Sequence, residues 1–146
     1  PLIVGFGEAV QLAYNNLELE NQRITKLRNN LIKGLSFNIE EIKINGDMDN
    51  RLPGNLNISF LNIKGESLIM RLGEISVSTG SACTSSTLKP SHVLKALGLS
   101  DELAFSTIRI GIGRFNTDED IETAINLITD VIKNLKLKRK LHEIIN

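Results

Sequence analysis

Apolar residues recur at helical spacing near both ends of this 146-residue chain. Over residues 1–35 this spacing predicts one long helix or two consecutive helices, ending by Gly34. Near the other end, Asn116 or Thr117 is a suitable N-cap, and acidic residues follow in the first turn. The apolar stripe behind that cap predicts a second long helix through Ile121, Ile125, Ile128, Ile132 and Leu135.

Between the two long helices the pattern changes to alternation, which is typical of strands. Strands are predicted at residues 42–44, 56–60, 75–77 and 107–112, and Asn45-Gly46 forms a turn after the first. Short helices are predicted from Gly65 and from Pro90-Ser91, the latter ending at Gly98. We therefore expect an α+β sandwich in which a small, mostly antiparallel sheet is covered on one face by helices, built as a single domain over residues 1–146.

Arg109 lies on the strand at 107–112, on the opposite face from the isoleucines. Its neighbours on that face are Gly111 and Gly113, which leave backbone open for a ligand. An arginine there suits a small acid, because guanidinium binds carboxylate through two parallel hydrogen bonds. An arginine on a solvated sheet face explains the pattern equally well.

The only cysteine, Cys83, lies in a run composed almost wholly of glycine, alanine and hydroxyl residues, from Ser78 to Thr87. A lone cysteine is by default a small buried hydrophobe, but such residues are normally flanked by large apolar side chains. Cys83 is not, so the segment predicts a flexible loop with a reactive thiol that is activated from elsewhere. A papain-type mechanism is disfavoured because only His92 and His142 are available as a base.

The composition narrows the class of protein. Seventeen basic and seventeen acidic residues cancel, so charge gives no reason to expect nucleic acid or a membrane surface as partner. One cysteine excludes an internal disulfide framework and fits the reducing cytoplasm. No zinc-ligand, Walker or dinucleotide glycine pattern is present. Because the chain begins with Pro1, we expect either processing at this residue or, in preference, that the chain comes from a longer polypeptide.

Several segments, in order, resemble cysteine desulfurases of the NifS/IscS type, within the class V aminotransferase family. The similarity runs from about Leu2 to Leu135 without large gaps. It is carried by the segments Gly65 to Met70, Ser78 to Ser85, Pro90-Ser91, Leu97 to Leu99, Ile108-Arg109 and Gly113 to Phe115.

The resemblance implies the small C-terminal domain of an enzyme with the aspartate-aminotransferase fold (fold type I), which uses pyridoxal 5′-phosphate and turns L-cysteine into L-alanine and a persulfide. Cys83 matches the attacking thiolate, and Arg109 matches the arginine that binds the substrate carboxylate. The cofactor lysine matches nothing in this chain and would lie in the absent large domain. Cys83 as a transient ligand of an iron–sulfur cluster is a further implied role.

By the same resemblance the full enzyme is a homodimer that delivers sulfur to acceptors such as an iron–sulfur scaffold, and serves iron–sulfur cluster assembly and tRNA thiolation. The isolated chain is then expected to be inactive. Two other functions remain open from the residues. One is a non-catalytic partner-binding module, and the other is a free-standing persulfide carrier on Cys83.

Overall fold

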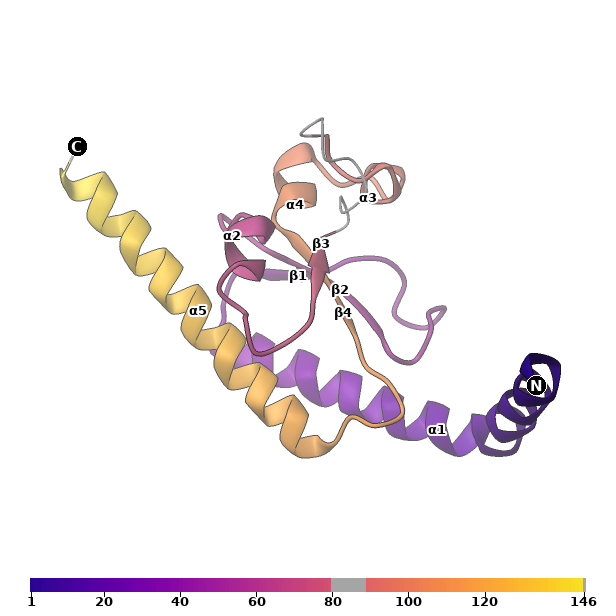
Figure 1. Ribbon diagram of the computed structural model, residues 1–146. Helices are drawn as coiled ribbons and strands as arrows, with labels where there is room; N and C mark the ends of the chain where they lie inside the picture. The colour runs from indigo at the N-terminus through magenta and orange to yellow at the C-terminus, as the bar shows by residue number, and fades with distance from the viewer. Residues whose placement is uncertain (80–88, 146) are drawn as a thin grey trace.

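A computed structural model describes residues 1–79 and 89–145, and the two long helices are confirmed. Helix α1 (Leu2–Asn38) and helix α5 (Asp118–Ile145) cross the same face of the sheet and pack against each other (Figure 1). The prediction that the first helix ends by Gly34 is wrong. A Cβ atom at Gly34 would lie 2.3 Å from Cδ1 of Ile125. This glycine therefore allows α1 and α5 to approach closely, and α1 continues past it.

The sheet has four strands in the order β1-β2-β4-β3, and each neighbouring pair is antiparallel, as predicted. The strands are β1 (Ile42–Ile44), β2 (Asn55–Phe60), β3 (Ser78–Thr79) and β4 (Thr107–Gly111). Ile58 lies opposite both Ile44 on β1 and Ile108 on β4. The isoleucines therefore point to one face, which is the face that α1 and α5 cover.

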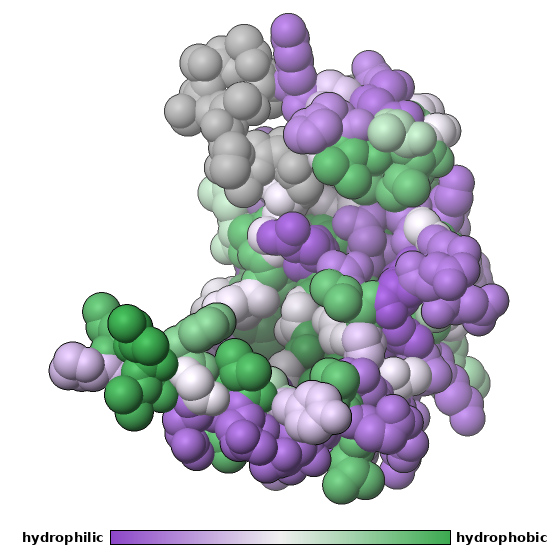
Figure 2. Space-filling view, turned by 90° about the vertical axis from the view of Figure 1, so that its right-hand side faces the viewer, coloured by the Kyte–Doolittle hydropathy of each residue, from purple (hydrophilic) through white to green (hydrophobic). Residues whose placement is uncertain are grey.

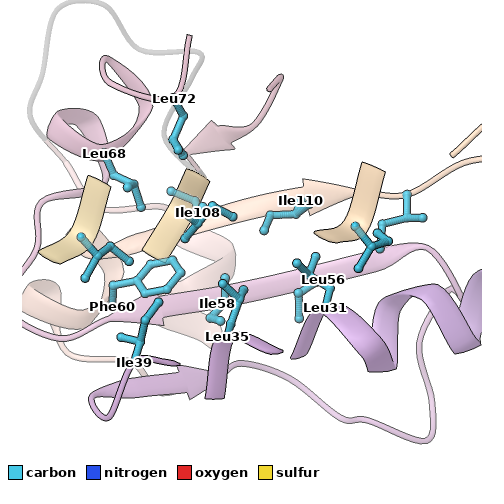
Figure 3. Packing of buried hydrophobic residues seen from close by; sticks show 14 of the residues in the cluster. Leu31, Leu35, Ile39, Leu56, Ile58, Phe60, Leu68, Leu72, Ile108 and Ile110 are labelled. Atoms are coloured by element: carbon cyan, nitrogen blue, oxygen red, sulfur yellow. The ribbon is translucent and has the colours of Figure 1, made fainter. Parts of the chain in front are cut away.

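One hydrophobic core lies between the sheet and the two long helices (Figure 3). Leu31 and Leu35 of α1 lie against Leu56 and Ile58 of β2, and all four side chains are fully buried. Burying one such side chain contributes about 1.5–3 kcal/mol. This cluster fixes the sheet on α1 and leaves the other face of the sheet for polar side chains.

Three short helices complete the fold: α2 (Gly65–Ile69), α3 (His92–Ala96) and α4 (Asp101–Phe105). The first two were predicted, and Gly98 follows α3 in the left-handed region at φ +79°. Helix α4 was missed. Its signal was present, since Ser100 caps it by accepting a hydrogen bond from the Leu103 amide, and Asp101 lies in its first turn.

The third strand was predicted at residues 75–77, but the ladder occupies Ser78–Thr79. Ile75 and Val77 pack against the main core as partly buried side chains. Their apolar alternation therefore reflects side-chain burial and not strand pairing. The hydrogen bonds to β4 begin only where Ser78 lies opposite Arg109. The strand is short and shifted because partner register, not side-chain pattern, decides where pairing starts.

The first half of α1 extends beyond the rest of the fold (Figure 1), and Figure 2 shows a projecting arm rich in apolar residues. Leu2 and Ile3 are each 88% exposed, and Phe6 is 71% exposed. A helix segment with this many apolar side chains normally packs against another element or another molecule. Within residues 1–79 and 89–145, no helix combines the length and the apolar character that crossing a membrane requires.

Candidate functional site

The face of the sheet that points away from α1 and α5 is polar along β2 and β4. Asn57 and Ser59 of β2 alternate with the core residues, and so do Thr107 and Arg109 of β4. Ser59 and Thr107 are fully buried where α4 closes one end of this face. Arg109 is exposed, so the polar face is covered at one end and accessible at the other.

Arg109 lies opposite Asn57 on one side and opposite Ser78 on the other. No hydrogen bond or ion pair joins its guanidinium to any residue that the structure describes. A Cβ atom added at Gly111 would meet nothing within 4 Å, and neither would one at Gly113. A side chain at either glycine would therefore meet open space, and within residues 1–79 and 89–145 nothing takes up the five N–H donors of Arg109.

Arg109 forms one wall of a pocket of about 490 Å³. The other walls come from the turn after β1, from β2 and from α3. The residues that line it are Asn45, Gly46, Asp47, Asn50, Arg51, Asn55, Asn57, Ser91, Val93, Leu94, Leu97 and Arg109. The pocket thus joins segments about 60 residues apart in the sequence, as only the folded chain can do.

A second arginine, Arg51, lines the same pocket and holds the loop between β1 and β2. Its Nη2 donates to the carbonyl oxygen of Asn45 and its Nε donates to that of Asp47, both at 2.6 Å. Its Nη1 is buried and has no partner among the described residues. Burial and the positive charge of Arg28 lower the pKa of Arg51, and Asp47 partly offsets both. The two arginines in the lining, Arg51 and Arg109, outnumber the one carboxylate, Asp47, so the pocket is cationic.

A buried hydrogen-bond network underlies the pocket. Asn45 Nδ2 donates to Asn57 Oδ1 at 2.9 Å and to Ser59 Oγ at 2.8 Å. Ser59 Oγ lies 2.7 Å from Thr107 Oγ1, which donates to the Leu103 carbonyl oxygen at 2.6 Å. The network ties the turn after β1 to β2, β4 and α4 beneath the pocket floor. Sequence analysis missed Arg51 and Asn57, because a polar residue in a loop or alternating strand has no signal of its own.

The turn after β4 is held by α1. Arg23 Nη2 donates to the carbonyl oxygen of Arg114 at 2.5 Å, and its Nη1 donates to that of Asn116 at 2.7 Å. Arg114 forms an ion pair with Glu20 and donates from Nη2 to Oε2 at 2.9 Å. The hydrogen bond from Arg114 lowers the pKa of Glu20 below its usual 4.5. Arg114 therefore positions the end of β4 and does not line the pocket.

The two predicted site residues have different outcomes. Arg109 lies at the pocket, beside the end of β3. Cys83 lies outside the described residues, and so does most of the loop expected from Ser78 to Thr87. The start of that loop was wrong, because Ser78 and Thr79 form β3, which ends four residues before Cys83 in the sequence. His92 is exposed on α3. In the part of the chain that the structure describes, no three metal-ligating side chains gather into a cluster.

The family model that matches this chain is "Aminotransferase class-V", over residues 1–124. The "Cysteine desulfurase IscS" of Ruthia magnifica subsp. Calyptogena magnifica is 54% identical over 134 residues, and that of Shewanella piezotolerans is 55% identical over 134 residues. Each match covers 92% of this chain and 33% of the relative. The chain therefore spans about a third of the length of these curated relatives.

Solved structures agree with the sequence comparisons. A "NifS-like protein" matches with a TM-score of 0.77 at 30% identity, over 90% of this chain and 33% of that one. A NifS-like protein from Rickettsia africae ESF-5 matches with a TM-score of 0.75 at 31% identity, over 90% of this chain and 34% of that one. The expected fold, a small α+β unit of a NifS-like enzyme, is confirmed.

Proposed function

The chain belongs to the class-V aminotransferase family, and on that premise we propose that it is the substrate-binding and sulfur-carrying part of a cysteine desulfurase. The observation that carries the proposal is the Arg109 guanidinium, which makes no ion pair with a described residue and lines an open, cationic pocket. An arginine in this setting binds a carboxylate through its two-pronged fork. The names of the relatives supply the substrate class, a cysteine.

The sulfur chemistry is assigned to Cys83. Its thiolate attacks the sulfur of L-cysteine, so that a sulfur–sulfur bond forms as the carbon–sulfur bond breaks. The electron pair remains on the carbon, and a proton added there gives L-alanine. β3 supports this role, because Ser78 lies opposite Arg109 and Cys83 follows five residues later. Five residues can span at most about 16–18 Å, which is an upper bound on the distance between Ser78 and Cys83.

Enzymes of this family use pyridoxal 5′-phosphate, which withdraws electrons from the amino-acid substrate when bound. The pocket beside Arg109 does not fit that group. Among the described residues that line it, none is a lysine that could bind the aldehyde and none is an aromatic residue that could stack on the ring. The pocket fits the substrate carboxylate, and the cofactor must be held by residues outside it.

We therefore propose that residues 1–146 form one domain, and that a separate large domain supplies the cofactor lysine. The exposed apolar residues on the first half of α1 support this arrangement, because a helix so apolar gains stability when another surface covers it. The isolated chain is then inactive. We also propose that the full enzyme is a homodimer in the reducing cytoplasm. Its sulfur acceptors then include an iron–sulfur scaffold, and it serves iron–sulfur cluster assembly and tRNA thiolation.

The proposal is tested on full-length protein, meaning this chain together with the large domain proposed above, loaded with pyridoxal phosphate. The assay measures the L-alanine and sulfide formed from L-cysteine. Cys83→Ser should abolish sulfide release, and mass spectrometry should find one added sulfur atom on Cys83 in the unsubstituted protein. Arg109→Lys keeps the charge but loses the fork, so KM should rise about 10- to 100-fold. Arg114→Lys is the matched control, because Arg114 pairs with Glu20 away from the pocket.

The outcomes separate the candidate functions. Equal KM values in the Arg109 and Arg114 variants would refute the role of Arg109. A protein that forms no L-alanine yet takes up sulfur on Cys83 from another desulfurase is a persulfide carrier. A protein that does neither is a partner-binding module, and the proposal fails.

A further inference from the structure

The buried network beneath the pocket has a defined direction of donation, because it ends on a backbone carbonyl. The Leu103 carbonyl oxygen can only accept a hydrogen bond, so Thr107 Oγ1 donates its single hydroxyl proton to it, at 2.6 Å. Ser59 must then donate its proton to Thr107 Oγ1, at 2.7 Å. Having no further proton, Ser59 accepts from Asn45 Nδ2, at 2.8 Å. Each step follows from the number of protons that the groups carry.

The direction of donation fixes the amide of Asn57. Asn45 Nδ2 uses its second proton on Asn57 Oδ1, at 2.9 Å. If the Asn45 amide were turned around, its oxygen would face Ser59, whose proton is already committed to Thr107. Asn57 therefore presents its oxygen to the buried network. Its Nδ2, on the other side of the same planar group, carries two protons and donates to no residue that the structure describes.

Asn57 and Arg109 are directly opposite each other in the antiparallel pair and line the same pocket. Side chains in such positions have Cβ atoms about 4.5–5.5 Å apart, which allows both to reach one small group. A carboxylate has two oxygens and about four lone-pair sites, so it accepts a bidentate arginine and still accepts another donor. The pocket thus places the charged guanidinium of Arg109 beside the neutral amide donor of Asn57.

We propose that Nδ2 of Asn57 donates a hydrogen bond to the same ligand carboxylate that Arg109 binds, which makes Asn57 a second substrate-binding residue. The proposal rests on the proposed function, in which that ligand is an amino acid. The two residues contribute differently. Arg109 has a long, exposed side chain, whereas the buried network holds the Asn57 amide in one orientation before the ligand binds.

The test measures dissociation constants by titration calorimetry on full-length protein loaded with pyridoxal phosphate, with two probes. L-alanine carries the carboxylate, and ethylamine is the same molecule without it. Asn57→Ser should raise the dissociation constant of L-alanine about 10- to 100-fold and leave that of ethylamine within about twofold. Asn57→Asp keeps the acceptor for Asn45 but turns a negative oxygen toward the pocket, so L-alanine should bind still more weakly.

Asn55→Ser is the matched control, because Asn55 lines the same pocket on the same strand but lies opposite Gly111. Both probes should bind this variant as they bind the unsubstituted protein. If Arg109→Lys weakens L-alanine binding and neither Asn57 variant does, Asn57 has no role in binding the carboxylate. The same holds if the Asn57 variants weaken both probes equally. If the unsubstituted protein does not bind L-alanine, the proposed function fails and this inference fails with it.

Discussion

Replacing Gly54 by alanine should strongly destabilise the fold and open the pocket. Gly54 precedes β2, and its carbonyl oxygen accepts a hydrogen bond from the Ile112 amide at 2.8 Å. A Cβ atom at this position would lie 1.9 Å from the carbonyl oxygen of Ile112, where ordinary contacts are 3.4–4 Å. The obstacle is backbone, which no side-chain rotation can relieve, so the loop between β1 and β2 must move away from β4.

The expected cost combines two terms. Overpacking costs about 1–3 kcal/mol, and the lost hydrogen bond about 1 kcal/mol, giving a decrease of roughly 2–4 kcal/mol in the free energy of unfolding. That is a large share of the roughly 5–15 kcal/mol typical of a folded protein. With a urea m-value of about 2 kcal/mol/M, the unfolding midpoint should fall by roughly 1–2 M.

Urea unfolding followed by far-ultraviolet circular dichroism measures the effect. Gly73→Ala is the control, because a Cβ atom there would meet nothing within 4 Å. Its free energy of unfolding should change by no more than about 0.5 kcal/mol. If Gly54→Ala and Gly73→Ala unfold at the same urea concentration, the close approach between the start of β2 and the end of β4 does not contribute to stability, and the reasoning is refuted.

Three further predictions follow from the structure. Thr107→Val keeps the shape but leaves the buried network without its link to the Leu103 carbonyl, so the free energy of unfolding should fall by about 1–3 kcal/mol, and an unchanged melting temperature would contradict this. Leu31→Ala empties a fully buried site and should cost about 2–5 kcal/mol by urea unfolding, against at most about 0.5 kcal/mol for Leu19→Ala at a position 71% exposed. The pKa of Glu20 is lowered in the folded state, so its stabilising contribution is complete above the usual 4.5 and is lost as pH falls through the folded value. Melting temperatures between pH 6 and pH 3 should therefore fall less steeply in Glu20→Gln than in the unsubstituted protein, and parallel curves would contradict the assignment.

Along the strands and in the packed parts of the two long helices, the sequence alone determined which residues face the core. At the start of α1 it did not, because the apolar residues there are exposed. Alternation along residues 107–112 placed Ile108 and Arg109 on opposite faces, and helical spacing placed Ile128 on the buried side of a long helix. These predictions were confirmed because apolar burial acts residue by residue and leaves a period in the chain. The family resemblance was also readable, since ordered motifs survive in the sequence whatever surrounds them.

The tertiary structure decided whatever depends on a partner distant in the sequence. Gly34 looked like a helix end, but the approach of Ile125 makes it an interior residue of α1. The third strand moved to Ser78 because pairing with β4 sets its register. Asn57 gained its significance only when Arg109 came to lie opposite it. Local sequence encodes which side chains prefer to be buried, whereas close contacts and strand register arise only when separate segments meet, so no local pattern records them.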